Sequence, residues 1–283
     1  MNDLHKPDLG PSPAAAGEKH SHVNPLSATE QLLQRILMRV RPAPVAVLLK
    51  KIFGVARRIV VTPRGRFWTD PISNLGAALT QRGEYEPEMA RTLGQFLKAG
   101  ATFVDVGANE GYFSVLAVGL VGPSGKVLSI EPQTRLIPII SENLKLNDAP
   151  CVNVVNVALS DTKKPVQMYL AADINTGASG IYKTAKYNLE QQSVQAVPLA
   201  QLLDAEGCRI VDLMKVDIEG AEYEMMLGAR EVFESGRVRA VALELHPHIL
   251  AARGLDPAEI VNMLERAGYR RDENAETAVW VRH

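Results

Sequence analysis

The stretch TFVDVGANEGYFS, residues 102–114, decides the fold of this chain. Apolar and β-branched residues lead to Asp105, and two glycines, Gly107 and Gly111, follow at a spacing of four. The next residues, VLAVGLVG, have the composition of a buried helix. Glycine at the end of a strand allows the backbone to approach a ligand without a clash from a Cβ atom. The stretch therefore predicts a strand, a glycine turn at a ligand, and a helix.

Outside this stretch, alternating patterns of strands and helices continue to the C-terminus. Strand patterns such as GKVLSIEP, IVDLMKVDIEG and VRAVALELHP are nearly continuous in apolar residues, and amphipathic helices separate them. This alternation is typical of an α/β fold with a doubly wound, mostly parallel sheet that helices cover on both faces. The final segments, YRRD and TAVWVRH, are too close in sequence for a crossover helix, so we expect an antiparallel strand at that edge. Between the third and fourth strands, we expect an irregular insert that contains YLAADINTGASGIYKTAKYN.

Composition places the chain among ordinary globular proteins. It has 283 residues, 46% of them hydrophobic, and a formal net charge of -1, so its charge gives no support for a nucleic-acid partner. No apolar run reaches the roughly 20 residues that span a bilayer, and the first residues lack the apolar core of a signal peptide. Cys151 and Cys208 have no metal-like spacing and are expected to be small apolar residues in a reducing compartment. We therefore expect a cytoplasmic protein.

The chain divides into three parts by composition. Residues 1–27 are rich in Pro, Ala, Gly, Ser and His and are predicted to be a disordered tail. Residues 28–84 form a basic extension, with two helical patterns and then a β-hairpin whose turn lies at residues 63–65. Residues 85–283 contain the α/β domain.

The extension is unusually basic. Between Glu30 and Thr69, Glu30 is the only acid, whereas the cations are Arg35, Arg39, Arg41, Lys50, Lys51, Arg57, Arg58, Arg64 and Arg66. One interpretation is an amphipathic helical cover that packs on the domain with its charges in solvent. The other is an interfacial segment over residues 30–58 that touches anionic lipid or a lipid-linked substrate at the inner face of the membrane.

Two common phosphate signatures are absent from the glycine turn. A dinucleotide fingerprint needs glycines where this chain has Asn109 and Tyr112, and a P-loop needs Lys and Ser or Thr after its last glycine. The second predicted strand ends in SIEP, and its acid, Glu131, lies 24 residues after Gly107. A carboxylate at this strand end is placed to accept hydrogen bonds from two ribose hydroxyls.

A ligand with a ribose and an amino acid but no phosphate is S-adenosylmethionine. Asp105, Gly107 and Gly111 suit its zwitterionic end, and Glu131 suits its ribose. The glycines by themselves are equally compatible with a tight turn between a strand and a helix, so Glu131 is the residue that favours this cofactor.

The chain resembles the FkbM family of S-adenosylmethionine-dependent methyltransferases from about Arg58 to the C-terminus. The motifs that support this are YEPE, FVDVGANEGYFS, IEP, ENLKLN, VALSD, LMKVDIEGAE and ALELHP. The resemblance implies a class I methyltransferase domain over residues 85–283, with a seven-stranded Rossmann-like sheet and an antiparallel edge strand. It implies a cofactor site that consists of Glu86, Asp105, Gly107, Ala108, Asn109, Gly111, Glu131, Pro132, Ala158, Asp161 and Asp217. Asn143 and Asn147 also match family positions, although a helix C-cap is an alternative role for Asn147.

Four ionisable residues follow the fourth and fifth strands. KVDIEG contains Asp217 and Glu219, and LELHP contains Glu244 and His246. Because neighbouring strands end at the same edge of the sheet, we expect these four catalytic candidates to lie near the transferred methyl. Either one of them is a general base, or Asp217, Glu244 and His246 hold a divalent metal that acidifies a hydroxyl; the sequence leaves both open.

Several ionisable residues near these strand ends also have a purely structural interpretation. Asp217 or Glu244 would neutralise Lys215 within its buried strand. His246, which precedes a proline, is also compatible with a loop residue without a role. Glu222, in the first turn of the next helix, is interpreted as an acid that interacts with the helix dipole.

The predicted function is methyl transfer to a hydroxyl of a sugar, a glycolipid or a secondary metabolite. The predicted acceptor is a small molecule, a glycan or a lipid-linked molecule. One alternative is an N-methyltransferase, although VDIE stands where the usual amine-orienting tetrapeptide is expected. The other is a module that binds the cofactor without catalysis, since fold alone does not determine function. Oligomeric state stays open.

Overall fold

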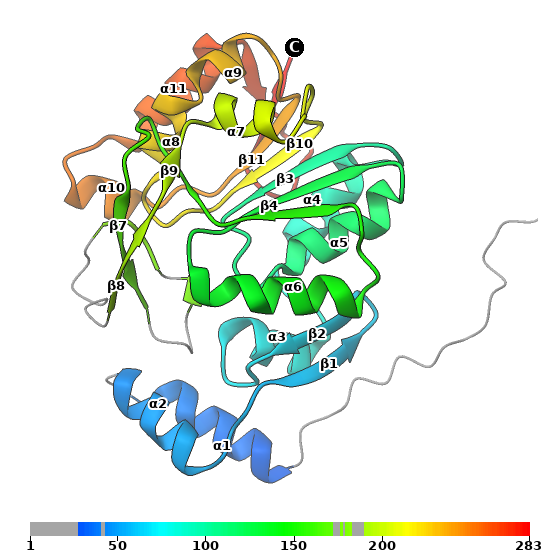
Figure 1. Ribbon diagram of the computed structural model, residues 1–283, viewed down its shortest axis with the longest axis vertical. Helices are drawn as coiled ribbons and strands as arrows, with labels where there is room; N and C mark the ends of the chain where they lie inside the picture. The colour runs from blue at the N-terminus through cyan, green and yellow to red at the C-terminus, as the bar shows by residue number, and fades with distance from the viewer. Residues whose placement is uncertain (1–27, 41–42, 172–175, 178, 183–189) are drawn as a thin grey trace, which may run out of the picture.

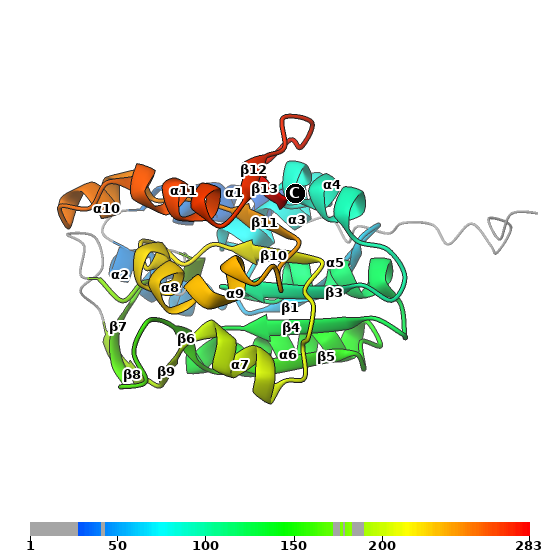
Figure 2. The same ribbon diagram turned by 90° about the horizontal axis from the view of Figure 1, so that it is seen from above.

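The computed structural model describes residues 28–40, 43–171, 176–177, 179–182 and 190–283. The predicted tail at residues 1–27 and part of the insert lie outside the described residues. The centre of the fold is a seven-stranded sheet with the strand order β12-β13-β11-β10-β3-β4-β5, which Figure 2 shows from top to bottom. The strands are β3 (Thr102–Val106), β4 (Lys126–Ile130), β5 (Val152–Val155), β10 (Leu213–Val216), β11 (Ala240–Leu243), β12 (Tyr269–Arg271) and β13 (Val279–Arg282).

The directions of the strands confirm the predicted topology. β5, β4, β3, β10 and β11 pair in parallel, and β13 pairs antiparallel with both β11 and the outermost strand, β12. The connection between β12 and β13 is too short for a crossover helix, which forces this reversal. Strand order changes direction at β3 and β10, so their carboxyl ends form the switch point where α/β folds bind ligands.

Helices cover both faces of the sheet, because successive residues of its strands alternate between two cores. Phe103 packs in the core under α4 (Pro87–Phe96), α5 (Tyr112–Val121) and α6 (Ile137–Leu146). Val104 packs in the opposite core. The helices of that side are α7 (Leu199–Ala205), α8 (Glu222–Gly228), α9 (Arg230–Glu234) and α11 (Pro257–Arg266), while η1 (Thr134–Leu136) precedes α6 and α10 (Pro247–Ala252) precedes α11. In the described residues, no helix has the length and apolar character that a bilayer crossing requires.

The basic extension contains the two predicted helices, α1 (Ala28–Arg39) and α2 (Ala43–Ile52), and the predicted hairpin of antiparallel strands β1 (Arg58–Thr62) and β2 (Gly65–Thr69). A further helix that was not predicted, α3 (Asn74–Arg82), follows the hairpin. Val60 and Phe67 from the hairpin are buried in the same core as Phe103. Figure 1 shows α1 and α2 beneath α3 and the hairpin, at the end of the molecule away from α11.

Polar contacts fix the hairpin to the domain. The Arg57 guanidinium donates to both carboxylate oxygens of the buried Glu110, at 2.9 and 3.1 Å. The Asn143 side chain accepts from the Trp68 amide at 2.6 Å. Asn147 stands at the C-cap of α6, as predicted, and its amide also exchanges hydrogen bonds with the backbone of Arg66.

The insert after β5 is more regular than its sequence indicates. It contains the short strands β6 (Ala158–Leu159) and β9 (Ala196–Val197), which pair in parallel. An antiparallel ribbon of β7 (Val166–Leu170) and β8 (Glu190–Val194) lies between them in sequence. The expectation of an irregular insert was therefore wrong for its described part. The sequence of β8, EQQSV, lacks the apolar alternation of a strand, and its pairing with β7 supplies the order.

Candidate functional site

Gly107 ends β3 in a conformation that requires glycine. Its φ is +81°, and a Cβ atom at this position would lie 1.9 Å from the carbonyl oxygen of Asp217. The turn after β3 is therefore pressed directly against the end of β10. This close approach creates the floor of a cleft at the switch point of the sheet.

Glu131 lies beside this turn at the end of β4. Its side chain is buried, and its two oxygens accept hydrogen bonds from the backbone amides of Asn109 and Gln133, both at 2.8 Å. Burial raises the pKa of Glu131 to about 7, and these two hydrogen bonds only partly oppose that effect. Glu131 is thus a rigid hydrogen-bond acceptor at the place where a ribose is expected.

A cleft opens along these strand ends. Its lining contains six of the predicted cofactor residues, namely Gly107, Asn109, Glu131, Pro132, Ala158 and Asp217. Apolar side chains from Ile130, Val157, Leu159, Met168 and Ile218 complete its walls. The cleft therefore combines carboxylates with apolar surface, which suits the ribose and the adenine of the expected cofactor.

The other predicted cofactor residues lie outside the lining of this cleft. Asp105 and Ala108 are buried behind it, and Gly111 forms the N-cap of α5 with a φ of +80°. Asp161 is exposed, and its carboxylate accepts from the Ser160 hydroxyl at 3.1 Å. The role of Asp161 at the adenine therefore stays a prediction.

Glu86 lies elsewhere, at a second depression. It has a φ of +43° at the start of α4, and it lines this depression together with Glu244. Burial, the charge of Asp217 and then that of Glu86 raise the pKa of Glu244. Glu86 and Glu244 are therefore neighbours of Asp217 on the side of the sheet that α4 covers.

Residues of the insert also line the cleft, and sequence patterns did not single them out as cofactor contacts. They include Gly177, Ser179, Gly180 and Ile181. The Thr176 hydroxyl donates to Asn109 at 2.8 Å, and the Ser179 hydroxyl donates to Gln133 at 2.9 Å. The glycine and serine content of the insert was the available signal, because such residues permit close approach to a cleft.

A row of polar residues crosses the sheet beneath the cleft. Ser129, Asp105 and Lys215 are opposite one another on β4, β3 and β10, and all three are buried. Ser114 on α5 donates to Asp105 at 2.7 Å and lies 2.5 Å from the Ser129 hydroxyl. The row places a positive charge in the core next to the carboxyl end of β10.

Lys215 connects this row to the rim of the cleft. Burial lowers the pKa of Lys215, but the charges of Asp217, Asp105 and Glu86 outweigh burial and raise it to about 12. Its Nζ lies 3.3 Å from Oδ2 of Asp217. The predicted partner Asp217 is therefore present, and this contact orients its carboxylate with Oδ1 on the other side.

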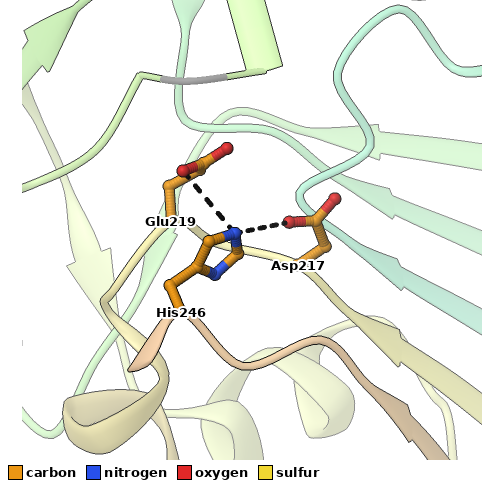
Figure 3. A group of neighbouring side chains, drawn as sticks. All are labelled: Asp217, Glu219 and His246. Carbon is orange, nitrogen blue, oxygen red and sulfur yellow. Dashed lines mark ion pairs between the residues drawn. The ribbon is translucent and has the colours of Figure 1, made fainter. Parts of the chain in front are cut away.

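Figure 3 shows Asp217, Glu219 and His246 converging at the rim. Nε2 of His246 lies 3.8 Å from Oδ1 of Asp217 and 3.6 Å from Oε2 of Glu219. One ligand atom from each residue lies within 4.8 Å of the other two, so the group is compact enough to hold a metal ion. Asp217 and Glu219 also line the cleft, which places this group beside the expected cofactor.

The opposite ring nitrogen of His246 is held by Glu222. Nδ1 lies 2.8 Å from Oε1 of Glu222, whose side chain is fully buried. Burial lowers the pKa of His246, but Glu222, Glu219 and Asp217 together raise it to about 9. Burial raises the pKa of Glu219 to about 7, which the charge of His246 partly opposes. Glu222 is therefore a partner of the histidine, and its interpretation as a simple helix-dipole acid was incomplete.

The structure also revises the predicted metal candidates. Asp217 and His246 belong to the compact group as expected, but Glu219 takes the place of Glu244 in it. The backbone of Glu219 has a φ of +51°, which turns this residue back toward the histidine. Glu244 is exposed and lines the second depression instead.

Comparisons with known proteins point to one family. A family model described as the methyltransferase FkbM domain matches residues 105–271. The chain is similar to the methyltransferase SdnD of Sordaria araneosa, with 29% identity over 164 residues. It is also similar to the antimetabolite synthetase AmbE of Pseudomonas aeruginosa, with 23% identity over 210 residues. These matches cover 48% and 62% of this chain, and the chain spans 62% and 10% of the length of these two relatives.

The chain is also similar to solved structures. The FkbM methyltransferase of Methylobacillus flagellatus KT is similar with a TM-score of 0.41 and 14% identity, over 90% of this chain and 71% of that chain. A methyltransferase of Aquifex aeolicus that depends on S-adenosylmethionine is similar with a TM-score of 0.40 and 17% identity, over 70% and 88% of the two chains.

Proposed function

This chain belongs to the FkbM methyltransferase family and uses S-adenosylmethionine, and we propose that it transfers the methyl group to a hydroxyl oxygen. The proposed acceptor is a sugar, a glycolipid or a hydroxylated secondary metabolite. The residues proposed for the chemical step are Asp217, Glu219 and His246, with Glu244 as an acceptor-side carboxylate.

The reaction is an in-line substitution at the methyl carbon. The acceptor oxygen forms a bond to this carbon while the bond between sulfur and carbon breaks, and its electron pair returns to sulfur. The products are a methyl ether, S-adenosylhomocysteine and one proton. Such a reaction requires alignment of the oxygen with the methyl group, exclusion of water and a place for the hydroxyl proton.

The observation that most supports oxygen as the acceptor is the position of Asp217. Its side chain lines the cofactor cleft and is also part of the compact group with Glu219 and His246. An acceptor at this rim would therefore lie next to three groups that can accept a proton or polarise a hydroxyl. An amine loses its proton more readily once it is methylated, so it has less need of such a group.

The second depression supports a hydroxyl-rich acceptor. Glu86 and Glu244 line it, and Thr277 adds a hydroxyl. Carboxylates accept hydrogen bonds from sugar hydroxyls, and Met89 and Leu243 provide apolar surface for the face of a ring.

The proposal is tested by supplying cofactor with a labelled methyl group to the full-length protein together with a cell extract that contains small molecules and lipids. We expect label in an extractable product, and we expect Asp217→Asn to lower the rate by about 10²–10⁴-fold. S-adenosylhomocysteine affinity, measured by calorimetry, should change little in this variant because Gly107 and Glu131 remain.

Two results would contradict the proposal. Label that appears only on protein or nucleic acid would exclude a sugar, a glycolipid or a secondary metabolite as the acceptor. If Asp217→Asn and the unmodified protein form the same product at equal rates, the assignment of the chemical step to this rim would be excluded.

A further inference from the structure

The group of Asp217, Glu219 and His246 has separations that hydrogen bonds do not explain. Nε2 of His246 is 3.6 and 3.8 Å from the two carboxylate oxygens, which is longer than a normal hydrogen bond. Carboxylate oxygens and imidazole nitrogens bind divalent ions at about 2.0–2.2 Å, so two ligands of one ion can lie as much as about 4.2 Å apart. Both separations fall within this range.

The surroundings hold each ligand in the orientation that an ion would need. Lys215 occupies Oδ2 of Asp217 and leaves Oδ1 directed at the histidine. Glu222 occupies Nδ1 of His246 and leaves Nε2 directed at both acids. A buried carboxylate on the outer nitrogen of a histidine is the usual support of a metal-binding imidazole.

The charges at this rim also favour a cation. Asp217, Glu219 and Glu222 contribute three carboxylates, of which only Asp217 has a lysine partner, Lys215, in the described part of the chain. Oε2 of the fully buried Glu222 has no hydrogen-bond partner among the described residues. His246 is the shared partner of all three carboxylates, and a divalent ion would bring further positive charge to this acidic group.

We propose that Asp217, Glu219 and His246 form a divalent-cation site of the Mn²⁺ or Mg²⁺ kind, with Glu222 as the residue that positions the histidine. One nitrogen and two carboxylate ligands leave coordination positions free for water and for an acceptor hydroxyl. The bound ion would make that hydroxyl more acidic and would hold its oxygen toward the cleft. The binding of the ion stands on this geometry alone, whereas its part in the reaction rests on the proposed function.

The test is a titration of the metal-free, full-length protein with Mn²⁺, in which electron paramagnetic resonance measures the free ion. We expect one site per chain, with affinity at least about tenfold weaker in Glu219→Gln and in His246→Gln. Glu244→Gln is the matched control, because it removes a carboxylate from the end of the neighbouring strand without touching the group, and its affinity should be unchanged. Mn²⁺ should also raise the melting temperature of the unmodified protein but not of Glu219→Gln.

Failure to bind Mn²⁺ at millimolar concentration would overturn the proposal, and so would equal affinity in Glu219→Gln and the unmodified protein. An equal loss in Glu244→Gln would also overturn it, because the site would then extend over the whole rim. The titration needs neither cofactor nor acceptor, so its failure would leave the proposed methyl transfer standing.

A second, independent observation concerns the exposed face of α1 and α2. Nine large hydrophobic side chains of the described residues are exposed, and seven of them lie between residues 32 and 59. Leu32 and Ile36 are 60% and 50% exposed on α1, and Leu48 and Ile52 are 57% and 66% exposed on α2. The inward faces of these helices are occupied, because Leu37 of α1 and Leu49 of α2 pack in one cluster with Ile72, which follows the hairpin.

Cations lie on the same helical faces. Arg35 stands between Leu32 and Ile36 at helical spacing, and Lys51 has the same place relative to Leu48 and Ile52. Both are exposed, and no carboxylate partner is found for either among the described residues.

Several other charged residues of the extension are already paired. Glu30, the only acid between residues 30 and 69, binds Arg58 at 3.1 Å, while Lys50 binds Asp70 and Arg57 binds Glu110. The exposed face therefore combines apolar side chains with positive charge that is free to act outward.

Helix α2 lies on the same side of the molecule as elements that border the cleft (Figures 1 and 2). Figures 1 and 2 both place α2 toward the same end of the molecule as β8 and α10. That end contains the cleft, because Met168 of β7 lines it and α10 begins directly after His246.

The geometry points to an anionic lipid surface as the partner of this α1–α2 face, with the four apolar residues inserted at headgroup level. The full-length protein should sediment with vesicles of mixed phosphatidylcholine and phosphatidylglycerol at low salt, and high salt should release it. Both the Leu48→Ser/Ile52→Ser and the Arg35→Glu/Lys51→Glu double variants should bind at least about tenfold more weakly. The matched control is Leu227→Ser, an exposed leucine on α8, which should bind like the unmodified protein.

Absence of sedimentation at low salt would overturn this proposal, and so would double variants that bind vesicles as strongly as the unmodified protein. An apolar face can also bind a second copy of the same chain, and sedimentation velocity without lipid tests for such a dimer. A dimer that becomes monomeric in Leu48→Ser/Ile52→Ser would assign the face to a second copy of the chain and contradict the lipid proposal.

Discussion

The buried carboxylate of Glu222, the first residue of α8, lies 2.8 Å from Nδ1 of His246, which directly precedes α10. The same Glu222 oxygen accepts from the Gly220 amide at 3.0 Å, which fixes it relative to the loop after β10. The contact sets the orientation of the imidazole, so that its other nitrogen faces Asp217 and Glu219. Glu222 therefore acts on the site through the histidine rather than through direct contact with a substrate.

Glu222 gives the first prediction. Glu222→Ala removes the acceptor for Nδ1 of His246 and should weaken Mn²⁺ binding by about 10–100-fold, the usual effect of losing an outer-shell partner. Glu222→Gln keeps a side-chain oxygen at the same position and should lose less affinity for Mn²⁺. Titration of each variant with Mn²⁺ makes the comparison, and equal affinities of Glu222→Ala and the unmodified protein would disprove the positioning role.

The second prediction concerns Gly107. Alanine here would place Cβ 1.9 Å from the backbone of Asp217 in a left-handed conformation that costs about 1–3 kcal/mol. We expect Gly107→Ala to weaken S-adenosylhomocysteine binding by at least about tenfold, because the floor of the cleft must move. Gly119→Ala is the matched control, since a Cβ there meets nothing within 4 Å, and calorimetry should find its affinity unchanged. Retained affinity in Gly107→Ala would show that this turn does not shape the cleft.

The third prediction is a pH dependence of cofactor binding. Burial raises the pKa of Glu131 to about 7, so the free protein carries a neutral carboxyl below that pH and a carboxylate above it. The ribose hydroxyls need the carboxylate as acceptor, so affinity should be lost as the pH falls through 7. Between pH 8 and pH 6 we expect S-adenosylhomocysteine to bind about tenfold more weakly, and Glu131→Gln should remove this dependence. A flat calorimetric profile for the unmodified protein would contradict the role of Glu131.

The fourth prediction tests how the extension is attached. Arg57→Ala leaves the buried carboxylate of Glu110 without its guanidinium and should cost about 3–5 kcal/mol. Thermal denaturation should show a melting temperature several degrees lower. The control is Arg230→Ala, which breaks the exposed pair with Glu234 and should melt like the unmodified protein. Equal melting of Arg57→Ala would mean that the hairpin is attached by apolar contacts alone.

Most of the fold follows from local patterns in the sequence. The apolar strands, the glycine turn at Gly107 and the acid at the end of β4 are each signals within a few residues. The parallel order and the reversed β13 follow from whether a connection is long enough for a crossover. The ribbon of β7 and β8 was missed, because the polar sequence EQQSV becomes a strand only by pairing with a partner that is distant in sequence.

The composition of the rim could be predicted only in part. Strand ends indicated that Asp217 and His246 would meet, which the structure bears out. The exchange of Glu244 for Glu219 depends on the left-handed backbone of Glu219, which no sequence pattern specified. Similarly, the role of Glu222 depends on how α8 and α10 cross in space, so its sequence position suggested only a helix-dipole acid.

The measurement that tests the central claim most directly is the ¹³C NMR spectrum of the isolated product after transfer from cofactor with a ¹³C-labelled methyl group. The chemical shift of the labelled carbon distinguishes a methyl ether from an N-methyl group, because oxygen withdraws more electron density than nitrogen. We predict that the unmodified protein forms a methyl ether. Asp217→Asn should form the same product at a rate about 10²–10⁴-fold lower. A labelled N-methyl product, or a methyl ether that Asp217→Asn forms at the full rate, would contradict this account.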